Sequence, residues 1–295
     1  MRANDSPAPI TVELSGGTGN QLFQLCAAVI VSKRTDREFR LDPLNLHLSM
    51  LPGSQRRRLS IGELLATHEL HSAATALFLR LSNLKFGYLP EEGPSDDPIS
   101  RVSTSTRRMS GYFQRFGLVE EASPEIFGRI KSSTVANTIL GTKPEQYIGV
   151  HVRCGDYLKP RAQLVHGLTR QDYFMDAIRH ASSITGLHDV QIISDDLAAA
   201  YSLLAKPLAE EGLTLTPAGQ GSEWRDLGVL ANSSAVVMSN SSFSWWGAYF
   251  AFKQHGALVV APVPWYANGI NVESILFSSD WHLINRYPES RSYET

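Results

Sequence analysis

The sequence is poor in cysteine and in long apolar runs, and it carries almost no excess charge of either sign. Only Cys26 and Cys154 occur among 295 residues, too few for the disulfide framework of a small secreted protein. The longest apolar run, residues 25–31, is far shorter than the roughly 20 residues that span a bilayer. The formal net charge of −2 gives no reason to expect a nucleic-acid partner. These absences exclude the disulfide-stapled and membrane-spanning classes.

The amino-terminal residues also lack the apolar stretch of a signal peptide. The first nine are polar and include two prolines, which predicts a cytoplasmic protein with reduced cysteines. What is present is a chain with 43% apolar residues, long enough to bury about 75% of its unfolded surface. Its length favours about two domains.

The first part of the chain indicates a strand, a glycine loop and a helix. Residues 10–14 are β-prone and residues 15–19 read SGGTG. A second strand is predicted at residues 38–41, which would complete a βαβ unit with a parallel sheet. The helix is predicted from apolar residues spaced three and four apart: Leu22, Leu25, Cys26 and Val29.

The next segment is leucine-rich, and it is predicted to be helical from residue 44 to about residue 86. Residues 91–98, EEGPSDDP, predict a turn-rich acidic loop whose carboxylates are solvated rather than part of a site. A Gly-Thr-Lys-Pro break follows at residues 141–144. We therefore expect one domain over residues 1–143 and a second over 144–295.

Strands and helices alternate through the second half of the chain. Strands are predicted at 147–152, 190–193, 235–238 and 257–261, and helices at 171–182, 224–231 and 244–254. Gly256 is placed to end the last helix. This alternation favours an α/β fold with a doubly wound, mostly parallel sheet, in which ligands bind beyond the carboxyl ends of the strands.

The first polar motif at such a strand end is the glycine loop. Gly17 and Gly19 would let the backbone approach a ligand closely, and the amides at the following helix start favour an anion. A dinucleotide fingerprint does not fit, because its third glycine would fall at Leu22. A merely tight turn would explain the glycines but not Asn20 and Gln21 directly behind them.

The second motif is HVRCGDY at residues 151–157. His151 and Arg153 alternate along the strand and so share a face, and the guanidinium fork suits a phosphate. Asp156 could either fix Arg153 or act on a substrate. The alternative is a buried ion pair beside a core histidine. Alternation aims Cys154 away from His151, which argues against a Cys–His nucleophile.

The third motif is Ser194, Asp195 and Asp196, after a predicted strand. Adjacent carboxylates at a strand end diverge, and no histidine clusters with them, so a divalent metal site is not expected. A carboxylate that accepts hydrogen bonds from a nucleobase or ribose fits better. The alternative is that one of the two acids caps the helix beginning near Leu197.

The fourth motif is NSSFSWWGA at residues 240–248. Ser241 and Ser242 precede a helix and would add hydroxyl groups to an anion-binding helix start. The aromatic residues that follow predict a buried core helix rather than a sugar-stacking surface. Together the four motifs predict a site for a nucleoside diphosphate.

The chain resembles the α-1,2-fucosyltransferases, and the resemblance covers nearly its whole length. It rests on GGTGNQLFQ at residues 16–24, GYFQ at 111–114, HVRCGDY at 151–157, HG at 166–167, SDD at 194–196 and NSSFSWWGA at 240–248. The resemblance implies a GT-B-like fold with two Rossmann-like domains facing a cleft. It further implies transfer of L-fucose from GDP-fucose, with inversion and without metal or cofactor, to the 2-hydroxyl of a terminal β-galactose on an oligosaccharide or glycolipid.

The resemblance also implies roles for individual residues. Arg153 would clamp the donor diphosphate, His151 would contact guanine or ribose, and Asn20 would lie near the transferred fucose. The other implied donor-binding residues are Gly17, Gly19, Ser194, Asp195, Asn240, Ser241, Ser242 and Phe243. Asp195 in this set would accept hydrogen bonds from guanine, and Ser241, Ser242 and Phe243 would hold the β-phosphate.

Two features depart from the family or stay open. Cys154 stands where the pattern usually has a second arginine, so the alternative function is a non-catalytic nucleotide-sugar or glycan binder with a decayed site. The base is either Asp156 or the departing phosphate. Tyr112 and Trp265 are candidates to stack on the acceptor sugar or to lie in the core, and residues 56–58, three arginines, are a candidate peripheral contact with the inner membrane.

Overall fold

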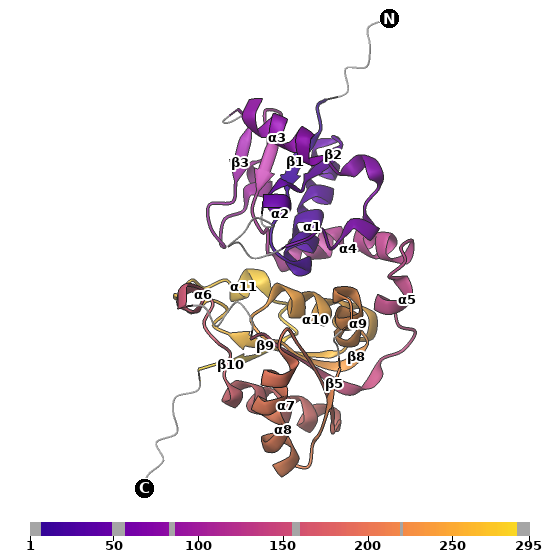
Figure 1. The fold of residues 1–295 in the computed structure, drawn as a ribbon, viewed down its shortest axis with the longest axis vertical. Coiled ribbons are helices and arrows are strands. Elements are labelled where there is room, and N and C mark those ends of the chain that lie inside the picture. Colours follow the sequence, from indigo (N-terminus) through magenta and orange to yellow (C-terminus); the bar gives the residue numbers. More distant parts are fainter. Residues whose placement is uncertain (1–6, 49–56, 83–85, 155–159, 219–220, 288–295) are drawn as a thin grey trace, which may run out of the picture. The chain divides into compact units, whose positions relative to one another are not determined.

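The computed structural model describes residues 7–48, 57–82, 86–154, 160–218 and 221–287. The chain divides into two compact units, Met1–Thr134 and Val135–Thr295 (Figure 1). The division falls ahead of the boundary expected after residue 143. The short helix α5 (Ala136–Ile139) belongs with the second unit, where the Asn232 side chain donates to the Thr138 carbonyl at 3.0 Å.

The first unit is built on a parallel sheet with strand order β2-β1-β4-β3. Its strands are β1 (Ile10–Glu13), β2 (Phe39–Asp42), β3 (Tyr88–Pro90) and β4 (Arg108–Ser110), and its long helices are α1 (Thr18–Thr35) and α4 (Phe116–Lys131). The predicted strand, glycine loop, helix and second strand are confirmed. Strands β3 and β4 have three residues each, too few to show an alternating pattern in the sequence.

The prediction of a continuous helical segment over residues 44–86 was wrong, because α-helix covers only about half of its described residues. Regular helix is confined to α2 (Leu44–Leu48) and α3 (Ala73–Ser82), with short 3-10 turns at Gly62–Leu64 and Thr67–Glu69. The backbone around residue 59 bonds elsewhere, because the buried Gln21 side chain donates to the Arg58 carbonyl and accepts from the Ser60 amide. Tertiary hydrogen bonds therefore override the helical spacing of the leucines there.

The second unit contains a parallel sheet with order β10-β9-β8-β5-β6-β7. Its strands are β5 (Glu145–Val152), β6 (Asp189–Ser194), β7 (Thr214–Pro217), β8 (Ser233–Val237), β9 (Leu258–Val263) and β10 (His282–Asn285). Its helices, apart from α5, are α6 (Pro160–Val165), α7 (Gln171–Thr185), α8 (Leu197–Glu210), α9 (Glu223–Ala231), α10 (Ser242–His255) and α11 (Glu273–Leu276). The four predicted strands are the four central ones, and the α/β class is confirmed.

Helix α10 is the core helix of the second unit. Trp245, Trp246 and Phe250 are fully buried, as predicted from a helix that is apolar on every side. Gly247 lies so close to Leu230 of α9 that a β-carbon there would clash, and Gly256 ends the helix at φ 63°. This packing fixes the start of α10 just beyond the carboxyl end of β8.

Candidate functional site

Three of the four polar motifs leave neighbouring strands. Strands β8, β5 and β6 are adjacent in the sheet and parallel, so the residues that follow them emerge at one edge. Those residues are Arg153 after β5, Asp195 after β6 and the Ser239–Ser242 segment after β8. The structure therefore places Arg153, Asp195 and the Ser239–Ser242 segment at one edge of the sheet.

Arg153 and Asp195 form an ion pair at this edge. Arg153 Nη1 lies 3.1 Å from Asp195 Oδ2, and the two side chains are 19% and 25% exposed. Asp195 Oδ1 accepts a hydrogen bond from the Cys154 backbone amide at 2.8 Å. The carboxylate thus holds both the guanidinium and the backbone of the residue beside it, while the arginine keeps access to solvent. Asp156, the other candidate partner for Arg153, lies outside the described residues.

The neighbouring acid and serine have local roles. Asp196 caps helix α8 by accepting from the Ala199 amide at 3.0 Å, so the capping alternative holds for Asp196. The Ser194 hydroxyl accepts from the Asp196 amide at 3.0 Å and donates to the Cys154 sulfur at 3.9 Å. Burial raises the pKa of the Cys154 thiol, and the nearby Asp195 and Asp196 carboxylates add to that rise. A raised pKa opposes thiolate formation and agrees with the rejection of a cysteine nucleophile.

His151 is buried beneath the sheet edge and is not exposed at its surface. It is 3% exposed, its Nδ1 lies 2.8 Å from the Ser239 hydroxyl, and its ring packs on Phe243 with 5.2 Å between centroids. Burial, with a smaller contribution from Arg153, lowers the pKa of His151 to about 3. The imidazole is therefore neutral at physiological pH and is a weak proton acceptor.

This lowered pKa predicts a pH effect on stability. A histidine whose pKa falls from 6.5 to about 3 on folding stabilises the protein above pH 6.5 and loses that contribution as pH falls. Between pH 6.5 and pH 5 the wild type should lose about 2 kcal/mol from this group, a loss that His151→Gln should lack. Urea unfolding followed by tryptophan fluorescence at both pH values measures the difference. Equal pH dependence in the two proteins would contradict the buried neutral histidine.

Asn240 ties three segments of the second unit together. Its Nδ2 donates to the His166 carbonyl at 2.7 Å and to the Trp265 carbonyl at 3.4 Å, and its Oδ1 accepts from the Thr169 hydroxyl at 3.0 Å. The buried amide is thus committed to the protein. It places the His-Gly pair of residues 166–167 beside the start of α10.

The start of α10 is capped by one of its own serines. Ser241 is the N-cap, and its hydroxyl accepts from the Phe243 amide at 3.3 Å. Ser242 and Phe243 are partly exposed in the first turn of this 14-residue helix. A helix of this length presents a partial positive charge at its N-terminus, which favours a phosphate.

In the first unit the glycine loop leads into α1 as predicted. Gly17 is the N-cap and Gly19 is buried in the first turn. Gly16 has φ 75°, and a β-carbon there would clash with the side-chain nitrogen of Asn20. Asn20 Oδ1 accepts from Gln114 Nε2 at 2.9 Å. The loop therefore brings the backbone close to the Asn20 amide.

Two glutamines outside the predicted site, Gln21 and Gln24, hold this loop. Gln24 Oε1 accepts from the Ser15 amide at 3.0 Å, and Gln24 Nε2 donates to the Gly111 carbonyl at 2.8 Å. Gln21 Nε2 donates to the Gly16 carbonyl at 3.1 Å. The signal was present in the sequence, because two amides on the apolar face of a helix need buried partners.

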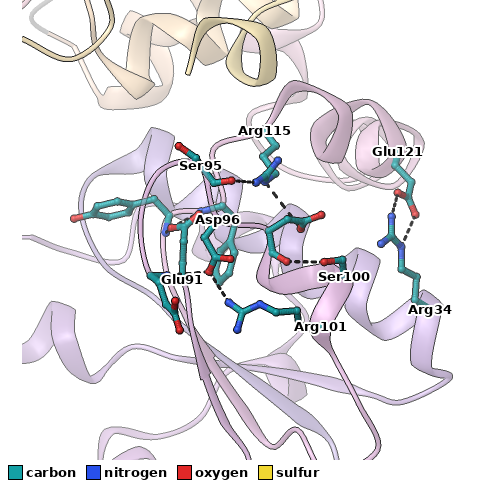
Figure 2. A network of polar contacts seen from close by, with 12 residues as sticks. Arg34, Glu91, Ser95, Asp96, Ser100, Arg101, Arg115 and Glu121 are labelled. Carbon is teal, nitrogen blue, oxygen red and sulfur yellow. Dashed lines mark hydrogen bonds and ion pairs between the residues drawn. The ribbon is translucent and has the colours of Figure 1, made fainter. Parts of the chain in front are cut away.

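The prediction that the acidic segment 91–98 is a solvated loop was wrong for Glu91. Its carboxylate accepts from the backbone amides of Tyr112 and Phe113 at 2.6 and 3.1 Å. Burial raises the pKa of Glu91, against the lowering effect of those two amides. Asp96 bonds Arg101 at 2.5 Å (Figure 2). The segment is thus tied by side chains to the strand-end residues 111–115.

The candidate acceptor aromatics differ in placement. Tyr112 is 45% exposed, whereas Trp265 is buried and packs edge-on against Phe277 with 5.5 Å between ring centroids. The core interpretation therefore holds for Trp265. In the described part of the chain, His, Cys, Asp and Glu residues form no group of three or more that could hold a metal ion. Within the same residues, no helix combines the length and apolarity needed to cross a membrane.

Comparison with known proteins yields a family and several relatives. The model of glycosyl transferase family 11 matches residues 9–285. The chain is 24% identical to the O-antigen biosynthesis glycosyltransferase WbnK of Escherichia coli, covering 91% of this chain and 98% of that protein. It is 25% identical to an alpha-1,2-colitosyltransferase of Escherichia coli, covering 87% and 92% of the two chains. It is also 30% identical to galactoside 2-alpha-L-fucosyltransferase SEC1 of Bos taurus, covering 38% of this chain and 30% of that protein.

Solved structures with a similar backbone fold were also found. POFUT1 in complex with GDP matches with a TM-score of 0.46 and 11% identity, over 88% of this chain and 99% of that chain. A mutant of Arabidopsis thaliana FUT1 in complex with GDP matches with a TM-score of 0.47 and 12% identity, over 88% and 71% of the two chains.

Proposed function

Because the chain belongs to glycosyl transferase family 11, we propose that it is a galactoside 2-alpha-L-fucosyltransferase. It would transfer L-fucose from GDP-fucose to the 2-hydroxyl of a terminal β-galactose, with inversion at the anomeric carbon. The observation that carries this proposal is the sheet edge of the second unit. There Arg153, fixed by Asp195 at 3.1 Å, and the serine-rich start of α10 follow neighbouring strands.

The reaction requires positive charge at the leaving group. As the bond between fucose and phosphate breaks, C1 of the sugar gains oxocarbenium character and the β-phosphate gains negative charge. The Arg153 guanidinium and the amides at the start of α10 supply positive charge from the protein. We therefore expect no metal or cofactor requirement. An arginine and a helix end can neutralise the departing diphosphate in place of a divalent ion.

The acceptor hydroxyl must lose a proton during transfer. Asp156 and the departing phosphate remain the two candidate proton acceptors. His151 is unsuited, because its low pKa and its hydrogen bond to Ser239 leave it a poor base. Asn20, at the start of the helix that follows the glycine loop, is the residue of the first unit that we assign to the transferred sugar.

A second donor sugar is favoured by one relative. The Escherichia coli alpha-1,2-colitosyltransferase covers 87% of this chain, and its name gives the same 1,2 linkage with a different transferred sugar. Colitose is therefore the alternative donor sugar. A site that hydrogen-bonds a sugar hydroxyl rejects an analogue lacking that hydroxyl by about 10⁴-fold or more, so the transfer rates of the two donors can tell them apart.

The test is a transfer assay with purified full-length protein. GDP-fucose is incubated with lactose, with other β-galactoside oligosaccharides and with a galactose-terminated glycolipid in vesicles, each with and without EDTA. We expect GDP release and a 1,2-linked product by NMR, unchanged by EDTA. Activated colitose is the parallel donor. Binding of GDP-fucose without GDP release on any β-galactoside would overturn the proposal in favour of a non-catalytic binder.

A further inference from the structure

The amide of Asn20 is oriented by one hydrogen bond from another strand end. We propose that Gln114 is a positioning residue that holds Asn20 with its side-chain nitrogen available to substrate oxygen atoms. Gln114 does not itself contact substrate in this proposal. The inference rests on the proposed function, which places Asn20 at the transferred sugar.

The hydrogen bond couples the orientations of the two amides. Gln114 Nε2 is a donor and lies 2.9 Å from Asn20 Oδ1, so the oxygen of Asn20 faces Gln114. Turning the Asn20 amide alone by 180° would set two NH₂ groups against each other and lose the bond. The Asn20 nitrogen therefore lies on the opposite side, over Gly16, where a β-carbon would collide with it.

Gln114 can act in this way because the residues on both sides of it are anchored. On one side the Glu91 carboxylate accepts from the Tyr112 and Phe113 amides at 2.6 and 3.1 Å. On the other side the Arg115 guanidinium donates to the Ser95 carbonyl at 2.6 Å (Figure 2). Both contacts tie the turn to the segment after β3. The backbone position from which the Gln114 side chain extends is therefore fixed.

The conformation of the turn carries a cost. Phe113 is a non-glycine residue at φ 53°, and Gly111 has φ 155° with the Glu91 side chain where a β-carbon would stand. A bulky residue in the left-handed region costs about 1–3 kcal/mol and persists only where its surroundings impose it. Here the surroundings are the Glu91 carboxylate and, through Gly111, the Gln24 amide. The residue that directly follows this strained turn is Gln114.

A purely structural link between α1 and β4 would use the same hydrogen bond, so the test must depend on its direction. Gln114→Glu keeps the size of the side chain but replaces the donor with acceptors. The carboxylate would attract the Asn20 nitrogen and turn the Asn20 oxygen toward the glycine loop. We expect kcat to fall about 10²-fold, with KM values changing less than 3-fold and a small change in Tm. Gln146→Glu, at an exposed site where the amide bonds Ser234 at 3.2 Å, is the matched control.

A double-mutant cycle with Asn20→Ala separates the positioning role from a structural one. If Gln114 acts through Asn20, Gln114→Glu should change kcat less than 2-fold once Asn20 is alanine. Multiplicative losses in the double variant would overturn the inference, as would wild-type kcat in Gln114→Glu. If Gln114→Glu does not fold, Gln114→Met removes the donor without reversing it. It should then lower kcat about 10-fold with Asn20 present and not when Asn20 is alanine.

The outcomes for the two proposals are distinguishable. A wild type that releases no GDP from GDP-fucose contradicts the proposed function itself. A wild type that transfers fucose, with an Asn20→Ala variant of unchanged kcat, leaves the proposed function standing and overturns the inference.

Discussion

Replacing Arg153 with alanine should lower turnover by about 10³-fold and change the free energy of unfolding by less than about 1 kcal/mol. The small stability effect follows from the partial exposure of the pair. Arg153 and Asp195 are 19% and 25% exposed, so water screens much of their attraction. The large activity effect follows from charge, because the β-phosphate gains additional negative charge as the bond between fucose and phosphate breaks, so Arg153 stabilises the transition state more than the bound substrate. The comparison uses steady-state GDP release and urea unfolding of the same preparations.

Two further variants sharpen the Arg153 test. Arg153→Lys keeps the charge but loses the planar fork, so it should recover only part of the activity. Arg179→Ala removes another exposed guanidinium, bonded to Glu211 and Asp176, and should leave turnover unchanged. A large stability loss in Arg153→Ala would instead support the interpretation that Arg153 and Asp195 are a structural ion pair beside a core histidine.

The central strands and the core helix could be predicted from sequence because their signals are local. Residues 147–152 and 235–238 are apolar runs of strand length, and both fall in buried strands of the sheet. Helix α10 carries aromatic residues on every side, so its burial could be predicted without knowing which elements pack against it. The parallel topology then placed Arg153 and Asp195 at one edge.

The parts that were missed depend on partners far away in the sequence. The leucine spacing of residues 57–72 suggested a helix, but Gln21 bonds that backbone from 37 and 39 residues away. Edge strands β7 and β10 have four residues each and partly exposed side chains, so their apolar signal is weak. Glu91 was assigned to solvent because nothing nearby in sequence indicates the amides that it accepts from.

The motifs contain residues of two kinds, which the sequence alone did not separate. Gln24 and Asn240 bond backbone groups and are buried, so they hold the loops in place. Arg153 and Ser242 remain partly exposed at the ends of regular elements. The length of each motif therefore reflects the hydrogen bonds that shape the loop as well as the groups that can meet a ligand.

Arg286, unlike Arg153, is completely buried. Its replacement should lower the free energy of unfolding and should not remove charge from the phosphate site. Its side chain has 0% exposure, and its guanidinium donates to the Pro264 carbonyl at 2.7 Å and to the His166 carbonyl at 2.5 Å. Arg286→Met keeps much of the apolar stem but leaves the Pro264 carbonyl without that donor. A buried acceptor stripped of its partner costs about 1–3 kcal/mol, and lost packing of the loops adds to it, so we expect a loss of about 2–4 kcal/mol.

All five tryptophans lie in the second unit, so the urea midpoint of tryptophan fluorescence reports on the region that Arg286 holds. Arg179→Met is the matched control, since the Arg179 side chain is 53% exposed and its ion pairs face solvent. It should cost less than about 1 kcal/mol. Equal losses in the two variants would mean that the Arg286 bonds to the loops at residues 166 and 264 add nothing to stability. A larger loss for Arg286→Met would identify the residue after β10 as the one that closes the loops around Asn240.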